Sequence, residues 1–159
     1  MSESPFWKFS LRFYAQSGVA PACIELQDTV GVDVNLLFFL LFLASNERGL
    51  TRDDIARIDA AVAPWRDNVV RPLRSVRRTL KNNLAVSEAE NLRTEVKRIE
   101  LESERLQQEA LFAMFPIGKI GTITSREAAA RANLAAYARY LGNVPQAPLE
   151  VVLRAFLDS

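Results

Sequence analysis

The chain has 159 residues and a formal net charge of +1, with 49% hydrophobic and 25% charged residues. These values are typical of one soluble globular domain, and the low net charge excludes a global field that would attract nucleic acid or an anionic membrane. The sequence contains no histidine, which removes the commonest general base and metal ligand. Its single cysteine, Cys23, permits no internal disulfide and favours a reducing compartment.

Two segments bear on where the protein is located. The N-terminal sequence MSESPFWKFSLRFYAQ has no early basic region followed by an uninterrupted apolar stretch, so it is not typical of a signal peptide. The most apolar run, LLFFLLFLA from Leu36 to Ala44, is far shorter than the roughly 20 residues that a bilayer requires. It predicts a buried core helix, and we expect a cytoplasmic protein without a membrane span.

Helical patterns run through most of the chain, and strand-like alternation is absent. Ser4 and Pro5 suit the cap and the first turn of a helix over residues 5–16. A second, short helix is expected over about 21–28. Asp33 then precedes the apolar run as a helix N-cap, because its carboxylate can accept the free N–H groups of the first turn.

The next part of the chain contains two prolines at helix-breaking positions. Thr51 with Asp54 resembles a capping box for a fourth helix, which Pro64 should end. A fifth helix is predicted from there to about Asn83, and Pro72 within it predicts a kink or a break. The inner stripe of this helix consists of Trp65, Val69, Leu73, Val76 and Leu80.

The longest helix is predicted over residues 87–115. Its stripe alternates spacings of four and three residues, which is typical of antiparallel or coiled-coil-like packing. Thr124 with Glu127 then forms a capping box for a helix that ends at Leu141, and a last helix follows the connector 143–148. The members of the stripe are Leu92, Val96, Ile99, Ser103, Leu106, Ala110 and Ala113.

These patterns together predict an all-α fold. We expect a single compact, bundle-like domain over residues 1–159, with about seven helices and one long helix near 87–115. No internal repeat and no long polar linker divides the chain.

Three segments of the sequence resemble a known family. The pattern W…Y…GV…C…LQD..G.DVNLL begins at Trp7, PLR..RR.LK follows from Pro72, and ELESER follows from Glu100. These segments resemble a family of short helical bacterial proteins, known mainly from proteobacteria and carried as a domain of unknown function. The resemblance covers roughly residues 6–111 and is most specific in LQD..G.DVN. It implies a helical fold and a bacterial origin, and it implies no activity.

The first candidate site lies just before the apolar helix. Gln27, Asp28, Asp33 and Asn35 bring carboxylates and amides together there, and such oxygen ligands suit Mg²⁺. The chain offers no second copy of this acidic motif. We therefore favour structural roles, with Asp33 as a helix cap and Asp28 in an ion pair with a nearby arginine.

The second candidate is the basic face of the fifth helix. Arg74, Arg77, Arg78 and Lys81 lie three or four residues apart and share one broad face. This face could bind the phosphates of a nucleotide or a nucleic acid, although no interleaved aromatic residue supports stacking on single strands. We favour the alternative that it pairs with the glutamates of the next helix, which a short connection should place antiparallel.

Two further groups have functional and structural interpretations. Glu100 and Glu104 lie one helical turn apart and could join an acidic metal site, but a di-iron bundle would also need histidines. We favour an exposed face on which they interact with Arg98 or Arg105. Cys23 has no histidine to activate it and is predicted to be a buried core residue. No metal ligand set is predicted.

Several candidate residues could form one internal polar network, which either specifies the fold or lines a ligand pocket. Our leading hypothesis is a cytoplasmic, non-enzymatic helical interaction module, an adaptor or regulator, with a protein partner or a homo-oligomer rather than nucleic acid. The alternative is a binding protein or enzyme that uses the polar cluster for a small anionic ligand or Mg²⁺. The sequence identifies no cofactor and leaves open whether the chain is an enzyme. The cluster consists of Gln27, Asp28, Asp33, Asn35, Arg74, Arg77, Glu100 and Glu104.

Overall fold

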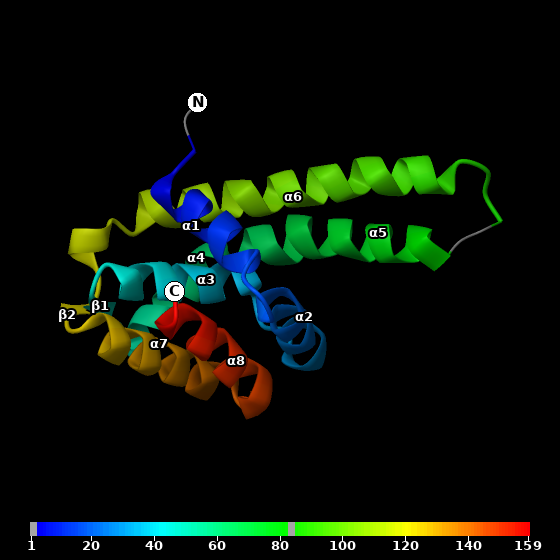
Figure 1. Ribbon diagram of the computed structural model, residues 1–159. Helices are drawn as coiled ribbons and strands as arrows, with labels where there is room; N and C mark the ends of the chain where they lie inside the picture. The colour runs from blue at the N-terminus through cyan, green and yellow to red at the C-terminus, as the bar shows by residue number, and fades with distance from the viewer. Residues whose placement is uncertain (1–2, 83–84) are drawn as a thin grey trace.

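The fold is built almost entirely from α-helices, and Figure 1 shows their arrangement. The computed structural model describes residues 3–82 and 85–159. The all-α prediction is confirmed, and no described helix is long and apolar enough to cross a membrane. Within these residues the α-helices are α1 (Pro5–Tyr14), α2 (Val19–Val30), α3 (Val34–Ser45), α4 (Arg52–Trp65), α5 (Arg71–Asn82), α6 (Ala89–Met114), α7 (Arg126–Leu141) and α8 (Gln146–Leu157).

A π-helical segment, Arg66–Val70, joins α4 to α5 without a break, so these two helices form one continuous rod. The prediction that Pro64 ends a helix is therefore wrong, because Pro64 lies inside α4. Pro64 is exposed, and water can hydrate the backbone carbonyl that its missing N–H leaves unpaired.

The helix does not break at Pro72 as predicted, because α5 continues through it, and the irregularity is the π-helical segment just before it. In a regular α-helix the proline ring would clash with the carbonyl four residues earlier. The wider turn just before Pro72, in which the Arg71 N–H donates to the Arg66 carbonyl, accommodates the ring. The predicted helix end at Asn83 lies outside the described residues.

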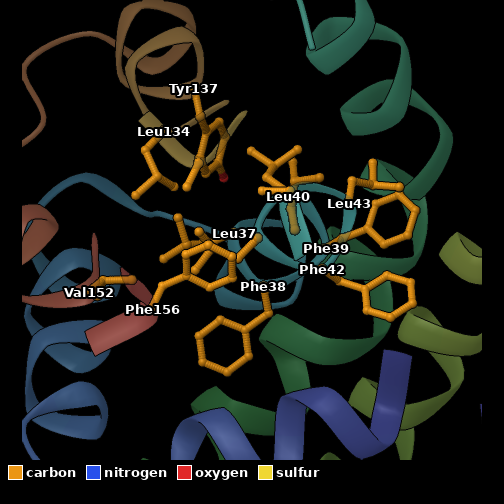
Figure 2. Close-up of a cluster of buried hydrophobic side chains, with 14 of the residues drawn as sticks. Leu37, Phe38, Phe39, Leu40, Phe42, Leu43, Leu134, Tyr137, Val152 and Phe156 are labelled. Carbon is orange, nitrogen blue, oxygen red and sulfur yellow. The ribbon is translucent and has the colours of Figure 1, made fainter. Parts of the chain in front are cut away.

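α3 is the centre of the hydrophobic core. Every residue from Asn35 to Ala44 is buried, as expected of a helix that is apolar on all sides. Figure 2 shows Leu134 and Tyr137 of α7 beside α3, with residues of α8 on another side. On the α1 side, the ring centroids of Phe6 and Phe39 lie 5.0 Å apart. The predicted core helix is confirmed.

A short antiparallel β-sheet connects the end of α3 to the start of α7. Its strands are β1 (Arg48–Gly49) and β2 (Thr122–Ile123). The 3₁₀ turn Ile117–Lys119 precedes β2. Gly121 has a φ of +73°, and a Cβ there would lie 2.6 Å from the Gly49 carbonyl oxygen, so a glycine is required. Strands of two residues are too short to show alternation, which is why the sequence did not predict them.

The helix caps confirm three predictions and correct one, and the first confirmed cap is Ser4 at the start of α1. Asp33 caps α3, and Thr51 with Asp54 forms the capping box of α4. The predicted cap at Thr124 is wrong, because the N-cap of α7 is Ser125. Thr124 instead continues the strand pairing, since its N–H donates to the Glu47 carbonyl at 3.0 Å.

α5 and α6 run antiparallel and extend beyond the other helices in Figure 1, and we call these two helices the arm. Most of the predicted packing stripe of α6 is not buried, although its member Ser103 is. Leu92, Ile99 and Leu106 are 54%, 44% and 42% exposed. α6 turns a largely polar face inward, because the surrounding helices offer it arginines and amides as partners. The buried residues of this face are Ala89, Glu100, Ser103, Gln107, Gln108 and Leu111.

Candidate functional site

Asp33 is the centre of the candidate site, and it is buried. One carboxylate oxygen accepts the Leu36 N–H at 3.2 Å, which caps α3, and the Asp33 backbone N–H donates to the Tyr137 hydroxyl at 3.1 Å. The other carboxylate oxygen accepts hydrogen bonds from Gln107 at 2.8 Å and Arg66 at 3.4 Å. Asp33 is therefore both a helix cap and a member of a buried network.

Asn35 continues this network toward α1. Its amide oxygen accepts from Gln108 at 2.8 Å, and its amide nitrogen donates to Gln107 at 3.5 Å. Gln108 in turn accepts a hydrogen bond from the Ser10 hydroxyl of α1 at 2.7 Å. In the described part of the chain, Arg93 Nε is the one buried side-chain polar atom without a partner. The network is therefore fully satisfied, as a stable buried polar network must be.

Arg66, the first residue of the π-helical segment, links the network to α4 and α7. Its guanidinium contacts Asp33 at 3.4 Å and Asp59 at 2.5 Å, and Asp59 also accepts from the Tyr140 hydroxyl at 2.8 Å. Burial by itself lowers the pKa of Arg66, but the hydrogen bond to Asp59 and the two carboxylate charges raise it overall. Arg66 thus stays charged and fixes two carboxylates.

A second cluster lies where α5 contacts α6. Glu100 is buried and accepts hydrogen bonds from Arg74, at 3.2 Å, and from Arg77. The hydrogen bond to Glu100 is the main cause of a raised pKa at Arg77. The predicted pairing of the basic helix with the next helix is confirmed for these residues. The prediction that Glu100 lies on an exposed face is wrong, since Arg98 and Arg105 pair with Glu95 and Glu102.

Glu104 also faces inward, beside Arg74, and the closest side-chain N–O distance between them is 3.9 Å. Burial raises the pKa of Glu104 to about 7, against the opposing charge of Arg74. The neighbouring carboxylates of Glu100 and Asp33 raise it further. Glu104 therefore titrates near neutral pH.

An open cleft of about 660 Å³ lies between the junction of α2 with α3 and one face of α5. Arg78 donates to Asp28 across it at 2.9 Å, and Arg71 donates to the Gly31 carbonyl at 3.1 Å. The predicted pairing of Asp28 with an arginine is confirmed. The polar residues that line the cleft are Gln27, Asp28, Asp33, Asn35, Arg66, Arg71, Arg74, Ser75, Arg78, Thr79 and Asn82.

The candidate residues that the sequence predicted lie in different parts of the structure: some line the cleft, and others lie where α5 contacts α6. Arg77, Glu100 and Glu104 lie at the contact of α5 with α6, and Lys81 is exposed on α5 outside the cleft lining. Cys23 is buried in the core as predicted, and burial raises the pKa of its thiol to about 12. The predicted residues that do line the cleft are Gln27, Asp28, Asp33, Asn35, Arg74 and Arg78.

Sequence reasoning named Glu100 in the polar cluster but missed Gln107 and Gln108, its neighbours on α6. Together with Leu111 they recur at helical core spacing, so they mark the inward face of this helix. A search for apolar stripes alone passes over them. A polar stripe at core spacing is the signal that would have found the network.

The described residues offer little support for a metal site. Within residues 3–82 and 85–159, no three histidine, cysteine, aspartate or glutamate side chains are grouped so that they could hold a metal ion. Both carboxylate oxygens of Asp33 already accept hydrogen bonds. The chemistry available in the cleft is therefore mainly that of hydrogen-bond donors.

Comparison with known proteins identifies a family. The family model described as "Protein of unknown function (DUF2390)" matches residues 5–111, which cover more than half of the chain and include every residue that lines the cleft. No curated protein and no solved structure matches the chain.

Replacing Asp33 should test whether it acts as more than a cap. Loss of a lone cap costs about 0.5–2 kcal/mol, whereas breaking a buried ion pair costs about 3–5 kcal/mol. We expect Asp33→Ala to lower the free energy of unfolding by about 3–5 kcal/mol. Asp33→Asn should cost nearly as much, because its amide N–H would face the amide N–H of Gln107. Urea unfolding measures both.

The control for this prediction is Ser125→Ala, which removes an exposed cap and should cost about 0.5–2 kcal/mol. The double variant Asp33→Asn with Gln107→Glu restores a donor opposite an acceptor and should regain part of the loss. An Asp33→Asn protein as stable as the Ser125→Ala protein would show that Asp33 is only a cap.

Glu104 should make stability depend on pH. Its folded-state pKa lies above its ordinary value of 4.5, so the folded protein binds this proton more tightly than the unfolded chain does. Stability must therefore fall as pH rises from about 4.5 through about 7. Glu104→Gln should flatten this decline and raise stability at pH 8 by about 1–3 kcal/mol. Urea unfolding across this pH range measures the effect.

The exposed Glu95→Gln serves as the control for the loss of one carboxylate on the same helix. If the Glu104→Gln curve runs parallel to that of the parent protein, proton binding at Glu104 is not coupled to folding.

Proposed function

The chain belongs to the DUF2390 family of proteins of unknown function, and we propose that it is a non-enzymatic helical interaction module. In this proposal the arm binds a partner that presents an amphipathic helical surface. The observation that carries it is a row of exposed apolar side chains along one side of the arm and the adjoining end of α4. We call this row the arm face; it consists of Trp65, Val76, Leu92, Ile99 and Leu106, each 38–54% exposed.

The arm face extends over three helices, since Trp65 is the last residue of α4, Val76 belongs to α5 and the other three residues belong to α6. The Trp65 indole N–H donates to the Ser103 carbonyl of α6 at 2.8 Å, which brings the end of α4 against the side of α6 that carries Ile99. Leu92, Ile99 and Leu106 are spaced by seven residues, so they lie on one line along α6. Isolated exposed apolar residues are common on protein surfaces, but a contiguous row is typical of an interaction site.

Charged pairs border the row on α6. Arg98 pairs with Glu95 at 3.4 Å, and Arg105 pairs with Glu102 at 2.6 Å. An apolar centre with a polar border is the usual composition of a protein–protein interface. The arm face therefore supports a protein partner better than it supports a nucleic acid.

The location and extent of this module are part of the proposal. We propose that residues 1–159 act as one domain in the cytoplasm of a proteobacterium, with LQD..G.DVNLL as the mark of the family. The single buried cysteine supports a reducing compartment, and the resemblance of three sequence segments supports the origin.

Site-specific photocrosslinking should test the proposal. A photoreactive amino acid in place of Ile99 should give a defined adduct in cells that express the protein naturally, because Ile99 lies at the centre of the arm face. The same photoreactive amino acid in place of Leu101 is the matched control. Leu101 is 53% exposed, and two helical positions turn it about 200° away from Ile99.

The adduct at position 99 should disappear when Leu92 and Leu106 are both replaced by glutamine. Mass spectrometry of the adduct then identifies the partner chain. No adduct at position 99, or equal adducts at positions 99 and 101, would contradict an interaction through the arm face.

The cleft favours a second candidate function, the binding of a small anionic ligand such as one that carries a diphosphate. Arg71 and Arg78 have half-exposed side chains at the cleft, and each guanidinium has five N–H donors. Ser75, Thr79 and Asn82 add hydroxyl and amide donors on the same face of α5. Anions bind such clustered donors through charge-assisted hydrogen bonds.

Pyrophosphate is the probe for this second function. If the cleft binds it, the melting temperature should rise by a few degrees at concentrations well above the dissociation constant. The Arg71→Gln/Arg78→Gln variant should lose this rise, whereas Arg98→Gln, whose arginine lies outside the cleft lining, should keep it. An equal rise in all three proteins would indicate nonspecific salt stabilisation.

A further inference from the structure

We infer that the arm face binds the arm face of a second copy of this chain, with the two α6 helices antiparallel. This inference rests on the proposed function and names its partner. It starts from an incomplete packing unit. A two-helix hairpin buries only one side of each helix, whereas four helices enclose a shared core. Two arms placed face to face would complete such a bundle.

The apolar residues of α6 are arranged so that they can match their own copy. Leu92 and Leu106 lie seven residues on either side of Ile99. With a two-fold axis at Ile99, each Leu92 lies opposite Leu106 of the second copy, and the two Ile99 side chains meet. The row extends over about 21 Å at 1.5 Å per residue, so three layers of side chains can interlock.

The charges at the border of the arm face select the antiparallel direction. Acidic and basic residues alternate along α6 as Glu95, Arg98, Glu102 and Arg105. With the axis at Ile99, Glu95 lies within two residues of the level of Arg105 of the second copy, and Arg98 lies within two residues of the level of Glu102. This offset is about 3 Å along the helix axis at 1.5 Å per residue. In a parallel arrangement this flank of one helix would face the other flank of its copy, so these acidic and basic residues would not meet one another.

The two helices of the arm contribute to the same side of this interface. Arg77 and Arg74 engage Glu100 on α6, while the Trp65 contact to Ser103 lies on the flank that carries Ile99. Val76 of α5 is 47% exposed, and helical spacing places it on the side of α5 away from the cleft residue Arg78. A second copy would therefore bury residues of both helices, as an isologous two-fold interface does.

Engineered cysteines in the full-length protein test both the partner and the direction. The native Cys23 is 1% exposed, so it contributes little background. Under mild oxidation Ile99→Cys should give a covalent dimer, since the two side chains meet at the axis. A mixture of Leu92→Cys and Leu106→Cys proteins should cross-link, whereas Leu92→Cys alone should not. Leu101→Cys is the control on the opposite side of α6.

Sedimentation equilibrium measures the same interaction without a covalent bond. The parent protein should form a dimer, and Ile99→Gln with Leu106→Gln should raise its dissociation constant about tenfold or more. Leu101→Gln should leave it unchanged. Because all of these side chains are exposed, the variants should keep the fold, which circular dichroism checks.

The outcomes separate this inference from the proposed function. A monomer at all concentrations, without a cross-link at position 99, overturns the self-association. If the photoadduct at position 99 then contains another protein, the interaction module stands with a different partner. If no adduct forms either, both fail. Cross-linking of Leu92→Cys with itself would overturn the antiparallel direction.

Discussion

The buried network around Asp33 and Asn35 is the interaction on which the rest of the structure depends. α3 is apolar on every side, and apolar packing by itself does not fix how a uniform cylinder is rotated or how far it slides. The network provides this information, because its hydrogen bonds tie the start of α3 to α1, α6, α7 and the π-helical segment. A buried polar group that loses its partner costs about 1–3 kcal/mol, so each wrong register of α3 is penalised.

The same network determines which way α6 faces. Gln107 and Gln108 must point inward to reach Asp33 and Asn35, and Glu100 must point inward to reach its two arginines. On a helix these positions share one side, so the apolar residues on the flank are left outside. Leu92, Ile99 and Leu106 are therefore exposed because of a constraint in the interior. The polar network therefore explains why this flank of α6 faces outward. It does not explain why the residues of the flank are apolar, and an interaction with a partner would explain that.

The sequence predicted those features that depend on local chemistry. Asp33 caps α3 through the N–H of a residue three positions later, and each side chain of the Thr51/Asp54 pair accepts the backbone N–H of the other. The apolar run predicts its own burial because it contains no polar face. The predictions that were wrong depend on residues far away in the sequence or on exposure to solvent. Ser125 rather than Thr124 caps α7 because Thr124 pairs with Glu47, and Pro64 stays helical because it is exposed. The inward face of α6 depends on partners in three other helices, which no local pattern contains.

The candidate site was predictable in part of its residues and not in its use, because Arg66, Gln107 and Gln108 were not among the predicted site residues. LQD..G.DVN places Gln27, Asp28, Asp33 and Asn35 at the cleft, yet the structural contacts of Asp28, Asp33 and Asn35 explain why these three would be needed without any ligand. Arg78 engages Asp28, and Arg66 engages Asp33.

The two candidate functions differ in what a ligand must displace. An anion that enters the cleft competes with carboxylates that its arginines already contact, so part of its binding energy is lost to that competition. A partner at the arm face displaces only water from apolar side chains, which is favourable by about 25 cal/mol for each Å² buried. The two surfaces thus differ in how far their groups already have partners within the chain. The arginines of the cleft already contact carboxylates, whereas the apolar side chains of the arm face are exposed to water. This difference is why we place protein interaction ahead of ligand binding.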